Sequence, residues 1–183
     1  MGDDASQHSR ACDIGGALTY GHNQVRDWLA SLLERWTGHR TQTEQVVNAW
    51  SSEEAGLARL DVVFSHEGKT SYVDVAVVNA FTTDADELPR RAQSDGRAAS
   101  LEVSSKRTRY KPSLNPSCGL VPFVVEALGR PAPETAELLR SVAPSHPGLR
   151  ARELGAAWQD LSCLIQGRLA EALSSAEHPS APR

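Results

Sequence analysis

Two aspartates lie inside strand-like runs of apolar residues, where acidic side chains are uncommon. Asp61 is part of LDVVF at 60–64, and Asp74 is part of YVDVAVV at 72–78. A carboxylate in an apolar strand must be paired, hydrogen-bonded or bound to a metal ion, because burying it alone is costly. On neighbouring strands the two Cβ atoms would lie about 5 Å apart. Like charges at that distance predict a divalent cation between them, and oxygen ligands favour Mg²⁺ or Mn²⁺.

Glu44 is a third acidic candidate, in the strand-like run TEQVV at 43–47. It either joins the two aspartates or is a solvated or capping residue, as a single acid near a strand end usually is. For Asp61 and Asp74, the apolar neighbours on each side favour a metal-binding or catalytic role over a structural one.

The basic run SKRTRYK at 105–111 is the next chemical feature. On a helix, Lys106, Arg109 and Tyr110 project from one face, because they are spaced by three and four residues. That face would present an ammonium, a guanidinium and a phenol either to the acidic pair or to a phosphate backbone. The alternative is a solvated helix end whose positive charge complements the helix dipole.

The formal net charge of the whole chain is -4, which argues against a strongly basic nucleic-acid binder. The charge is unevenly distributed, however. Residues 90–111 contain seven basic and two acidic residues, a local excess of +5. This excess predicts one cationic docking face on an otherwise acidic domain, with weak and salt-sensitive binding to nucleic acid.

The elements that must position these residues alternate between helical and strand patterns. Apolar residues from Val25 to Trp36 recur with the spacing of one helical face, and Gly38 fits the end of this helix. Valine-containing runs predict strands at 41–47, 60–64, 72–78 and 120–126, with a hairpin loop at 66–69. Further helices are predicted at 89–110, 133–142 and 149–173.

This order predicts an α/β fold with a mixed four-stranded sheet flanked by helices. The first three strands form a meander, and the helix at 89–110 carries the chain by a right-handed crossover to a fourth strand parallel to the third. The nearly unbroken apolar run at 120–126 predicts burial on both faces of that strand. The core is also predicted to include the four tryptophans: Trp28, Trp36, Trp50 and Trp158.

Length and composition exclude several classes of protein. With 183 residues, 40% of them hydrophobic, the chain suffices for one domain with a continuous core. The three cysteines form no CxxC pair, which argues against a disulfide framework and fits a reducing intracellular compartment. No apolar stretch approaches the ~20 residues of a membrane span, and the first residues show no secretory signal. Neither a GxSxG nucleophile motif nor a glycine-rich phosphate loop is present.

Four runs of the chain, taken in order, resemble a known family. They are RLDVVF at 59–64, YVDVAVV at 72–78, the K-x-x-R-Y of Lys106 to Tyr110, and PFVVEALG at 122–129, after an amphipathic helix that opens at Gly21. The region 21–142 resembles the restriction-like endonuclease domain of site-specific non-LTR retrotransposons, a branch of the PD-(D/E)XK nuclease superfamily. The chain then divides into a disordered tail at 1–20, the nuclease core at 21–142, a C-terminal helical extension at 143–173 and a disordered tail at 174–183.

The resemblance implies a DNA endonuclease that depends on Mg²⁺ or Mn²⁺. Asp61 would match the aspartate of the PD element and Asp74 the first acid of the (D/E)XK element, and both would bind the metal ion. Lys106 would match the lysine that this branch contributes from the following helix. Tyr110 would match the tyrosine of the same run, and Glu44 would match an acid often seen upstream in the superfamily.

The chain also departs from the family pattern. Leu60 stands where proline is usual, and Ala76 stands where the superfamily has its lysine, so the catalytic cation depends on Lys106. The zinc knuckle that precedes such domains is missing, because only Cys12 and His22 lie near the start and a closed zinc site needs four ligands. DNA phosphates would be bound by the basic side chains of the helix: Lys106, Arg107, Arg109 and Lys111.

The resemblance further implies partners and a location. The partners would be DNA and the reverse transcriptase or a DNA-binding domain of the parent element, with no membrane, and the location would be intracellular and nuclear. The oligomeric state is left open.

Two other interpretations stay open. The chain is either a decayed copy that binds nucleic acid or a partner protein without cutting, or an unrelated α/β binding module with structural aspartates. Convergence of both carboxylates on the amine of Lys106 would favour the nuclease, whereas divergence to opposite faces of the sheet would exclude it. Most of the six histidines are expected to be solvated.

Overall fold

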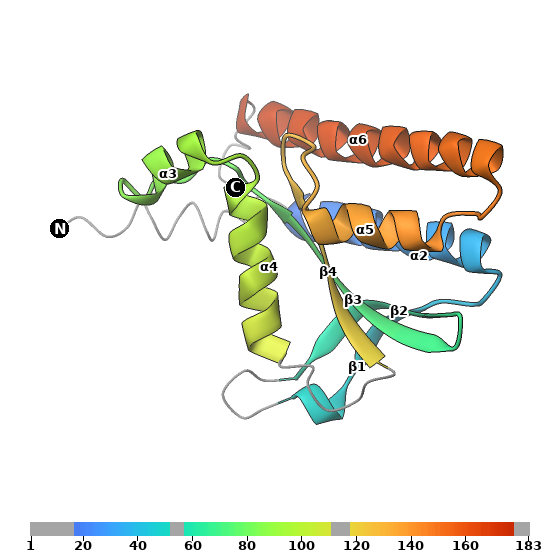
Figure 1. Ribbon diagram of the computed structural model, residues 1–183. Helices are drawn as coiled ribbons and strands as arrows, with labels where there is room; N and C mark the ends of the chain where they lie inside the picture. Colours follow the sequence, from blue (N-terminus) through green and yellow to red (C-terminus); the bar gives the residue numbers. More distant parts are fainter. Residues whose placement is uncertain (1–16, 52–56, 111–117, 178–183) are drawn as a thin grey trace, which may run out of the picture.

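The computed structural model describes residues 17–51, 57–110 and 118–177. It contains a four-stranded sheet in the order β1-β2-β3-β4, with helices on both faces (Figure 1). The strands are β1 (Gln42–Val46), β2 (Arg59–His66), β3 (Lys69–Val78) and β4 (Cys118–Glu126). β1, β2 and β3 are antiparallel neighbours, whereas β4 runs parallel to β3. The predicted α/β fold with a mixed four-stranded sheet is therefore confirmed.

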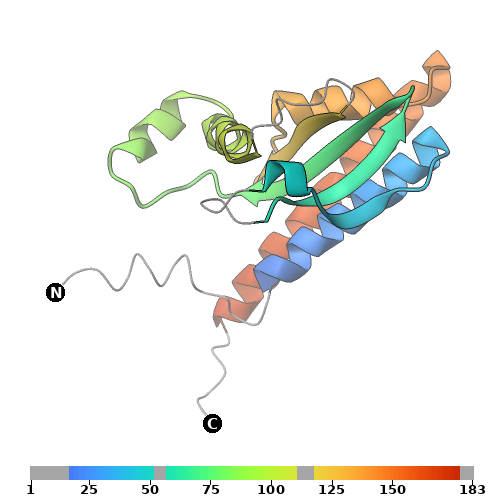
Figure 2. The ribbon, with the colours of Figure 1, turned by 90° about the horizontal axis from the view of Figure 1, so that it is seen from below.

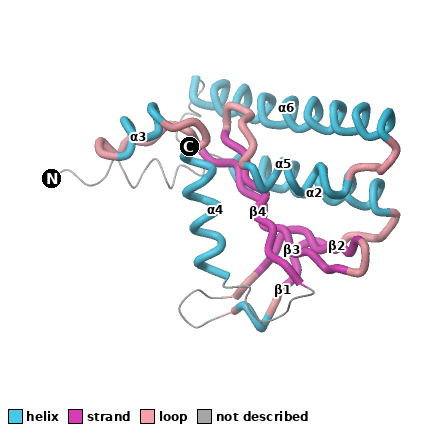
Figure 3. Tube along the Cα trace, in the orientation of Figure 1, coloured by secondary structure: helices cyan, strands magenta, loops and turns pink. Residues whose placement is uncertain are grey.

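The helices are α2 (Ala17–Thr37), α3 (Glu87–Gln93), α4 (Arg97–Tyr110), α5 (Pro133–Val142) and α6 (Pro147–Glu177), with a short 3₁₀ helix, η1 (Asn48–Trp50) (Figure 3). α2 and α6 both extend into the polar ends for which composition predicts disorder. Packing of an amphipathic face stabilises a helix beyond what local propensity alone indicates. The rest of the predicted tails, 1–16 and 178–183, lies outside the described residues. No helix in the described ranges is long and apolar enough to span a membrane.

A tight turn sets the register of β2 and β3. Glu67 has φ 50° and Gly68 has φ 75°, and two successive positive φ angles are typical of the type I′ hairpin turn. The turn places Val62 opposite Val73. Because side chains alternate along a strand, a slip of one residue would move every side chain to the other face. This turn therefore determines where both aspartates point.

The prediction of one helix over 89–110 is wrong, because the chain turns a corner between α3 and α4. Ser94 is extended, with φ -130° and ψ 107°, and Gly96 adopts the left-handed φ of 73°. A residue without Cβ takes that conformation at little cost. α3 has no buried residue and stands away from the body of the protein in two views (Figures 1 and 2). Of these two helices, α4 is the one that packs against β3 and β4.

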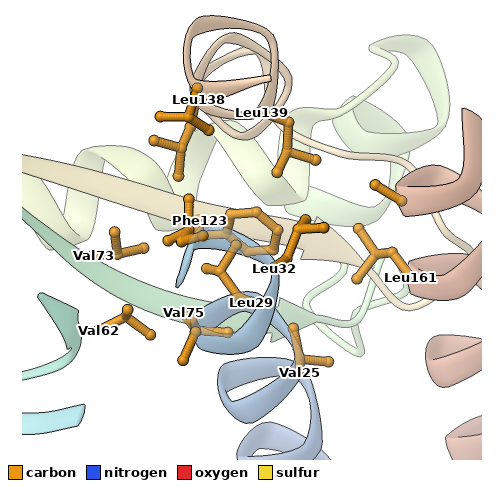
Figure 4. Packing of buried hydrophobic residues seen from close by; sticks show 14 of the residues in the cluster. Val25, Leu29, Leu32, Val62, Val73, Val75, Phe123, Leu138, Leu139 and Leu161 are labelled. Atoms are coloured by element: carbon orange, nitrogen blue, oxygen red, sulfur yellow. The ribbon is translucent and has the colours of Figure 1, made fainter. Parts of the chain in front are cut away.

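The main core lies between one face of the sheet and the helices α2, α5 and α6 (Figure 4). The apolar stripe of α2 buries Val25, Leu29 and Leu33 completely. Full burial of a side chain of this size contributes about 1.5–3 kcal/mol. The strands contribute Val62, Phe64, Val73, Val75, Phe123 and Val125. As predicted, three tryptophans pack against this core: Trp28, Trp36 and Trp158.

α4 covers the opposite face of the sheet. Ala99 and Val103 of α4 form a small cluster there with Val124. β4 is completely buried on both faces at its centre, as its apolar run predicts. A third cluster closes the end of the sheet with Trp50, Leu60 and Tyr110, so the predicted core position of Trp50 is confirmed.

The outer edge of β4 is sealed by the start of α5. The hydroxyl of Thr135 accepts a hydrogen bond from the N–H of Val124 at 2.8 Å and donates one to the carbonyl of Val124 at 2.9 Å. Thr135 is completely buried. A further backbone hydrogen bond runs from the N–H of Glu126 to the carbonyl of Arg130 at 2.8 Å. The backbone groups of Val124 and the N–H of Glu126 are thus satisfied within the chain.

Candidate functional site

Asp61 and Asp74 come together where β2 and β3 separate. Their ladder ends at Val62 opposite Val73, and the same register continued by one residue places Asp61 opposite Asp74. There a side chain replaces the backbone ladder: Oδ2 of Asp61 accepts a hydrogen bond from the N–H of Val75 at 2.7 Å. Both aspartates are almost completely buried, at 8% and 7% exposure. The hairpin therefore forms a buried acidic pair.

Asp61 is also bound from the helix on the main-core side of the sheet. Nε2 of His22, near the start of α2, lies 2.9 Å from Oδ1 of Asp61. The imidazole is 33% exposed, so it lies between the buried carboxylate and solvent. Both oxygens of Asp61 thus have a hydrogen-bond partner, one from α2 and one from β3.

Lys106 reaches Asp74 from α4, on the side of the sheet away from α2. The two carboxyls nevertheless do not diverge, because they lie within hydrogen-bond reach of each other, and the ammonium pairs with Asp74. The parallel crossover places α4 over the face of β3 that carries Asp74, and Nζ of Lys106 lies 2.7 Å from its Oδ2. Nζ is also 3.4 Å from the carbonyl oxygen of Val75 and 3.6 Å from Oε1 of Glu102, one turn earlier on α4. Lys106 is only 7% exposed. The two carboxylates and this ammonium therefore gather around the peptide groups of one residue, Val75.

The two carboxyls have opposite pKa shifts. Burial raises the pKa of Asp74; Lys106 lowers it, and the hydrogen bond and charge of Asp61 raise it further. Burial also raises the pKa of Asp61. The hydrogen bond and charge of His22, together with the hydrogen bond from the N–H of Val75, outweigh burial and hold that pKa below its usual value. Environments that push two neighbouring pKa values apart are typical of sites where the groups have different roles. Asp61 is the carboxylate that stays ionised to lower pH.

Tyr110 closes the same site at the end of α4. Its side chain is buried against Trp50 and Leu60. Burial, then the charge of Asp74 and a hydrogen bond to it, raises the pKa of the phenol, so the hydroxyl stays protonated at neutral pH. The guanidinium of Arg109 lies 5.3 Å from the centre of the Tyr110 ring. The phenol therefore acts as a donor toward Asp74.

Glu44 is held by arginines instead of joining the aspartates. Its carboxylate forms ion pairs with Arg26 of α2 and Arg59 of β2. Glu44 has φ 59°, a left-handed conformation that is uncommon for a residue with a side chain and that interrupts the pairing of β1 with β2. Two cations on one carboxylate make an ion-pair cluster, and they offset the charge that a metal ligand would supply.

The donors present fit a magnesium ion held by two carboxylates. Among the described residues, no group of three or more His, Cys, Asp or Glu side chains is arranged to hold a metal ion. Mg²⁺ is usually bound through only one or two carboxylates, with water and substrate oxygens completing its shell. Asp61 and Asp74 supply that number, and the Val75 carbonyl beside them is a further oxygen donor. The fit therefore rests on these three groups and excludes Glu44.

Comparison with known proteins adds no family assignment. No protein-family model matches the chain, and no curated protein matches its sequence. The function must therefore be argued from the geometry of the site.

Two of the four predicted DNA-binding residues, Lys106 and Arg107, are paired with acids of the protein, whereas Arg109 is not among the described ion pairs. Arg107 forms an ion pair with Glu134 of α5 at 3.0 Å. Arg97 and Arg91, from the same basic segment, both pair with Glu87. Lys111 lies outside the described residues. The local excess of positive charge is thus offset by acids from other parts of the chain, and the exposed charge is smaller than the sequence count indicates.

Sequence reasoning missed His22 and Arg26, which hold Asp61 and Glu44. The signal that was available is their spacing of four residues beside the apolar stripe of α2, at Val25 and Leu29. A histidine and an arginine in adjacent turns next to a buried stripe lie at the edge of the helix contact, where acids of the sheet are within reach.

Proposed function

We propose that this chain is a metal-dependent nuclease domain that hydrolyses phosphodiester bonds in DNA. The observation that carries the proposal is the gathering of Asp61, Asp74 and Lys106 around Val75. The ordered motifs that resemble the restriction-like endonuclease domain of non-LTR retrotransposons support it. In that case DNA and the reverse transcriptase or DNA-binding domain of the parent element are the partners, and the nucleus is the location.

Each group has a role in this proposal. Asp61 and Asp74 would hold Mg²⁺, which would supply a Lewis acid for the phosphate and lower the pKa of water. Lys106 stabilises the negative charge that grows on the phosphoryl oxygens, and Tyr110 orients Asp74 by donating to it. The attacking water gives a proton to solvent as its oxygen bonds to phosphorus, the ester P–O bond breaks, and the departing oxygen takes a proton from solvent. No covalent bond to the protein is required.

A second candidate is a domain of the same fold that binds nucleic acid or a partner protein without cutting. The observation that favours it is the ion pair between Lys106 and Asp74, because the ammonium neutralises the carboxylate without any metal ion. The pairing of Arg107 with Glu134 points the same way, since it reduces the charge available for phosphates.

The deciding experiment is nicking of a supercoiled plasmid with Mg²⁺ and, separately, Mn²⁺. The variants are Asp74→Asn and Asp74→Ala, with Asp160→Asn, on the exposed side of α6, as the matched control. We expect Asp74→Asn to lower the nicking rate about a hundredfold or more, the usual effect of removing one essential polar group. Asp160→Asn should leave the rate unchanged, and EDTA should abolish nicking.

Each alternative result has a definite meaning. Equal nicking by the wild type and both Asp74 variants would contradict the assigned site. No nicking by a folded wild-type protein with either metal ion would favour the domain that binds without cutting.

A further inference from the structure

His22 contacts the buried acidic pair, and the proposed chemistry gives it no role. Its Nε2 lies 2.9 Å from Oδ1 of Asp61. A carboxylate oxygen accepts hydrogen bonds and has no proton to donate, so the contact assigns Nε2 as the donor. His22 therefore contributes a hydrogen bond to a carboxylate that is 8% exposed.

This hydrogen bond fixes an angle that the aspartate side chain would otherwise leave free. The last torsion of aspartate has a broad, roughly two-fold preference, so its carboxylate rotates readily unless both oxygens are held. The N–H of Val75 holds Oδ2 at 2.7 Å, and His22 holds Oδ1. Without His22, Oδ1 would lose this donor and the carboxylate would be held less firmly in its present orientation.

α2 is itself anchored at this point, which makes His22 a rigid donor. One turn further along, Arg26 pairs with Glu44 on β1. On the adjacent stripe, Val25 and Leu29 are completely buried in the main core. The helix is thus fixed by polar contacts to two neighbouring strands and by apolar contacts to the sheet.

We infer that His22 is a positioning residue that sets the orientation of the Asp61 carboxylate; its effect on metal binding rests on the proposed nuclease function. Loss of a residue that is hydrogen-bonded to a metal ligand, and not to the metal itself, typically weakens metal binding by about 10- to 100-fold. His22 acts through Asp61 and does not touch the substrate.

The test compares His22→Gln with His22→Asn. Both amides are polar, but only the longer glutamine brings a donor about as far as the imidazole Nε2. We expect His22→Asn to weaken Mg²⁺ binding in isothermal titration calorimetry by roughly 10- to 100-fold. His22→Gln should restore most of the affinity. The control is Trp36→Phe, which removes a 3.3 Å hydrogen bond from α2 to Glu153 on α6, far from Asp61 in the fold, and should leave the affinity unchanged.

A second readout needs neither metal nor activity. Because the N–H of Val75 donates to Asp61, its amide resonance in a ¹H–¹⁵N NMR spectrum of the metal-free protein reports the position of that carboxylate. We expect the resonance to shift and its hydrogen exchange to accelerate in His22→Asn, and to return toward the wild-type values in His22→Gln. Trp36→Phe should leave it in place.

The outcomes separate this inference from the nuclease proposal. An unchanged Val75 amide in His22→Asn would overturn the inference, whether or not the protein cuts DNA. A shifted amide in a protein that neither binds Mg²⁺ nor nicks DNA would support His22 as a positioning residue and contradict the nuclease. Equal loss of Mg²⁺ binding in both His22 variants would show that the imidazole is itself a metal ligand, which also overturns the inference.

Discussion

Both members of the ion pair between Lys106 and Asp74 are buried, each with 7% of its surface exposed. A charge in such a place is stabilised mainly by its partner, because water cannot replace the lost contact. The pair therefore joins α4 to β3. Removal of one member must be costly.

We predict that Lys106→Met destabilises the protein by about 3 kcal/mol, the typical cost of leaving one member of a buried pair alone. The double variant Lys106→Met/Asp74→Leu should recover most of that loss, because two apolar side chains need no partner. Urea denaturation followed by circular dichroism measures both values. A single variant within about 0.5 kcal/mol of the wild type, the usual range for surface substitutions, would contradict the buried pair.

Residue identity indicated part of the site and left its long-range partners undetermined. Asp61 and Asp74 could be chosen because acids in apolar strands need a partner, and Lys106 because of its spacing from Tyr110. His22 lies 39 positions from Asp61, and its place beside the apolar stripe of α2 does not specify which acid it contacts. Glu44 could not be separated from the aspartates by sequence, since its arginine partners come from a helix and a neighbouring strand.

Element boundaries at the α3–α4 corner depend on one backbone angle. Gly96 has φ 73°, and a Cβ placed there would meet only the side chain of Arg130 at 3.6 Å, an ordinary contact. Any penalty for a side chain at this position therefore comes from the backbone angle and not from a steric clash. The corner directs α4 onto the sheet so that Lys106 reaches β3.

We predict that Gly96→Ala destabilises the protein by about 1 kcal/mol, the cost of holding a residue with a side chain in the left-handed region. The matched substitution Gly155→Ala lies in the exposed middle of α6, with nothing within 4 Å of the new Cβ. It should stabilise the protein by up to about 1 kcal/mol, because alanine favours the helix. Opposite signs in thermal denaturation confirm the corner; equal stabilisation by both would contradict it.

Periodicity predicted the type and order of the elements well, because the strands and the amphipathic helices have clear apolar patterns. The helix at 89–110 is the instructive failure. Its residues favour helix locally, and the glycine that breaks it is tolerated inside many helices at a cost of about 1 kcal/mol. The packing of α4 on β4 favours a turn at this glycine, and this contact lies outside the local pattern.

At the scale of the whole molecule, charge is balanced within the fold. Of the described basic residues in 90–111, only Arg90 and Arg109 have no carboxylate partner among the described ion pairs, which join the others to Glu87, Asp74, Glu102 and Glu134. Basic side chains that are already paired within the protein neutralise fewer phosphates, so fewer counterions are released from the DNA when it binds.

We predict weak binding of duplex DNA with a shallow salt dependence, a slope of log K against log[salt] of about -2, from roughly 0.9 per phosphate contacted. Fluorescence anisotropy between low and physiological salt measures the slope. Arg109→Ala should reduce its magnitude by about 0.9, whereas Arg107→Ala should change it little. A slope of about -6 or steeper would mean that the internal pairs open on binding and would refute this balance.

The two borders of the sheet also determine how the protein behaves at high concentration. A long, regular strand at the border of a sheet is a template for pairing with another chain, which leads to aggregation. Thr135 occupies the backbone groups of Val124 on one border, and on the other the short β1 is interrupted by the left-handed Glu44. Within the described residues, neither border offers a long regular ladder. We expect the left-handed conformation of Glu44 to disfavour pairing of β1 with a second copy of the chain.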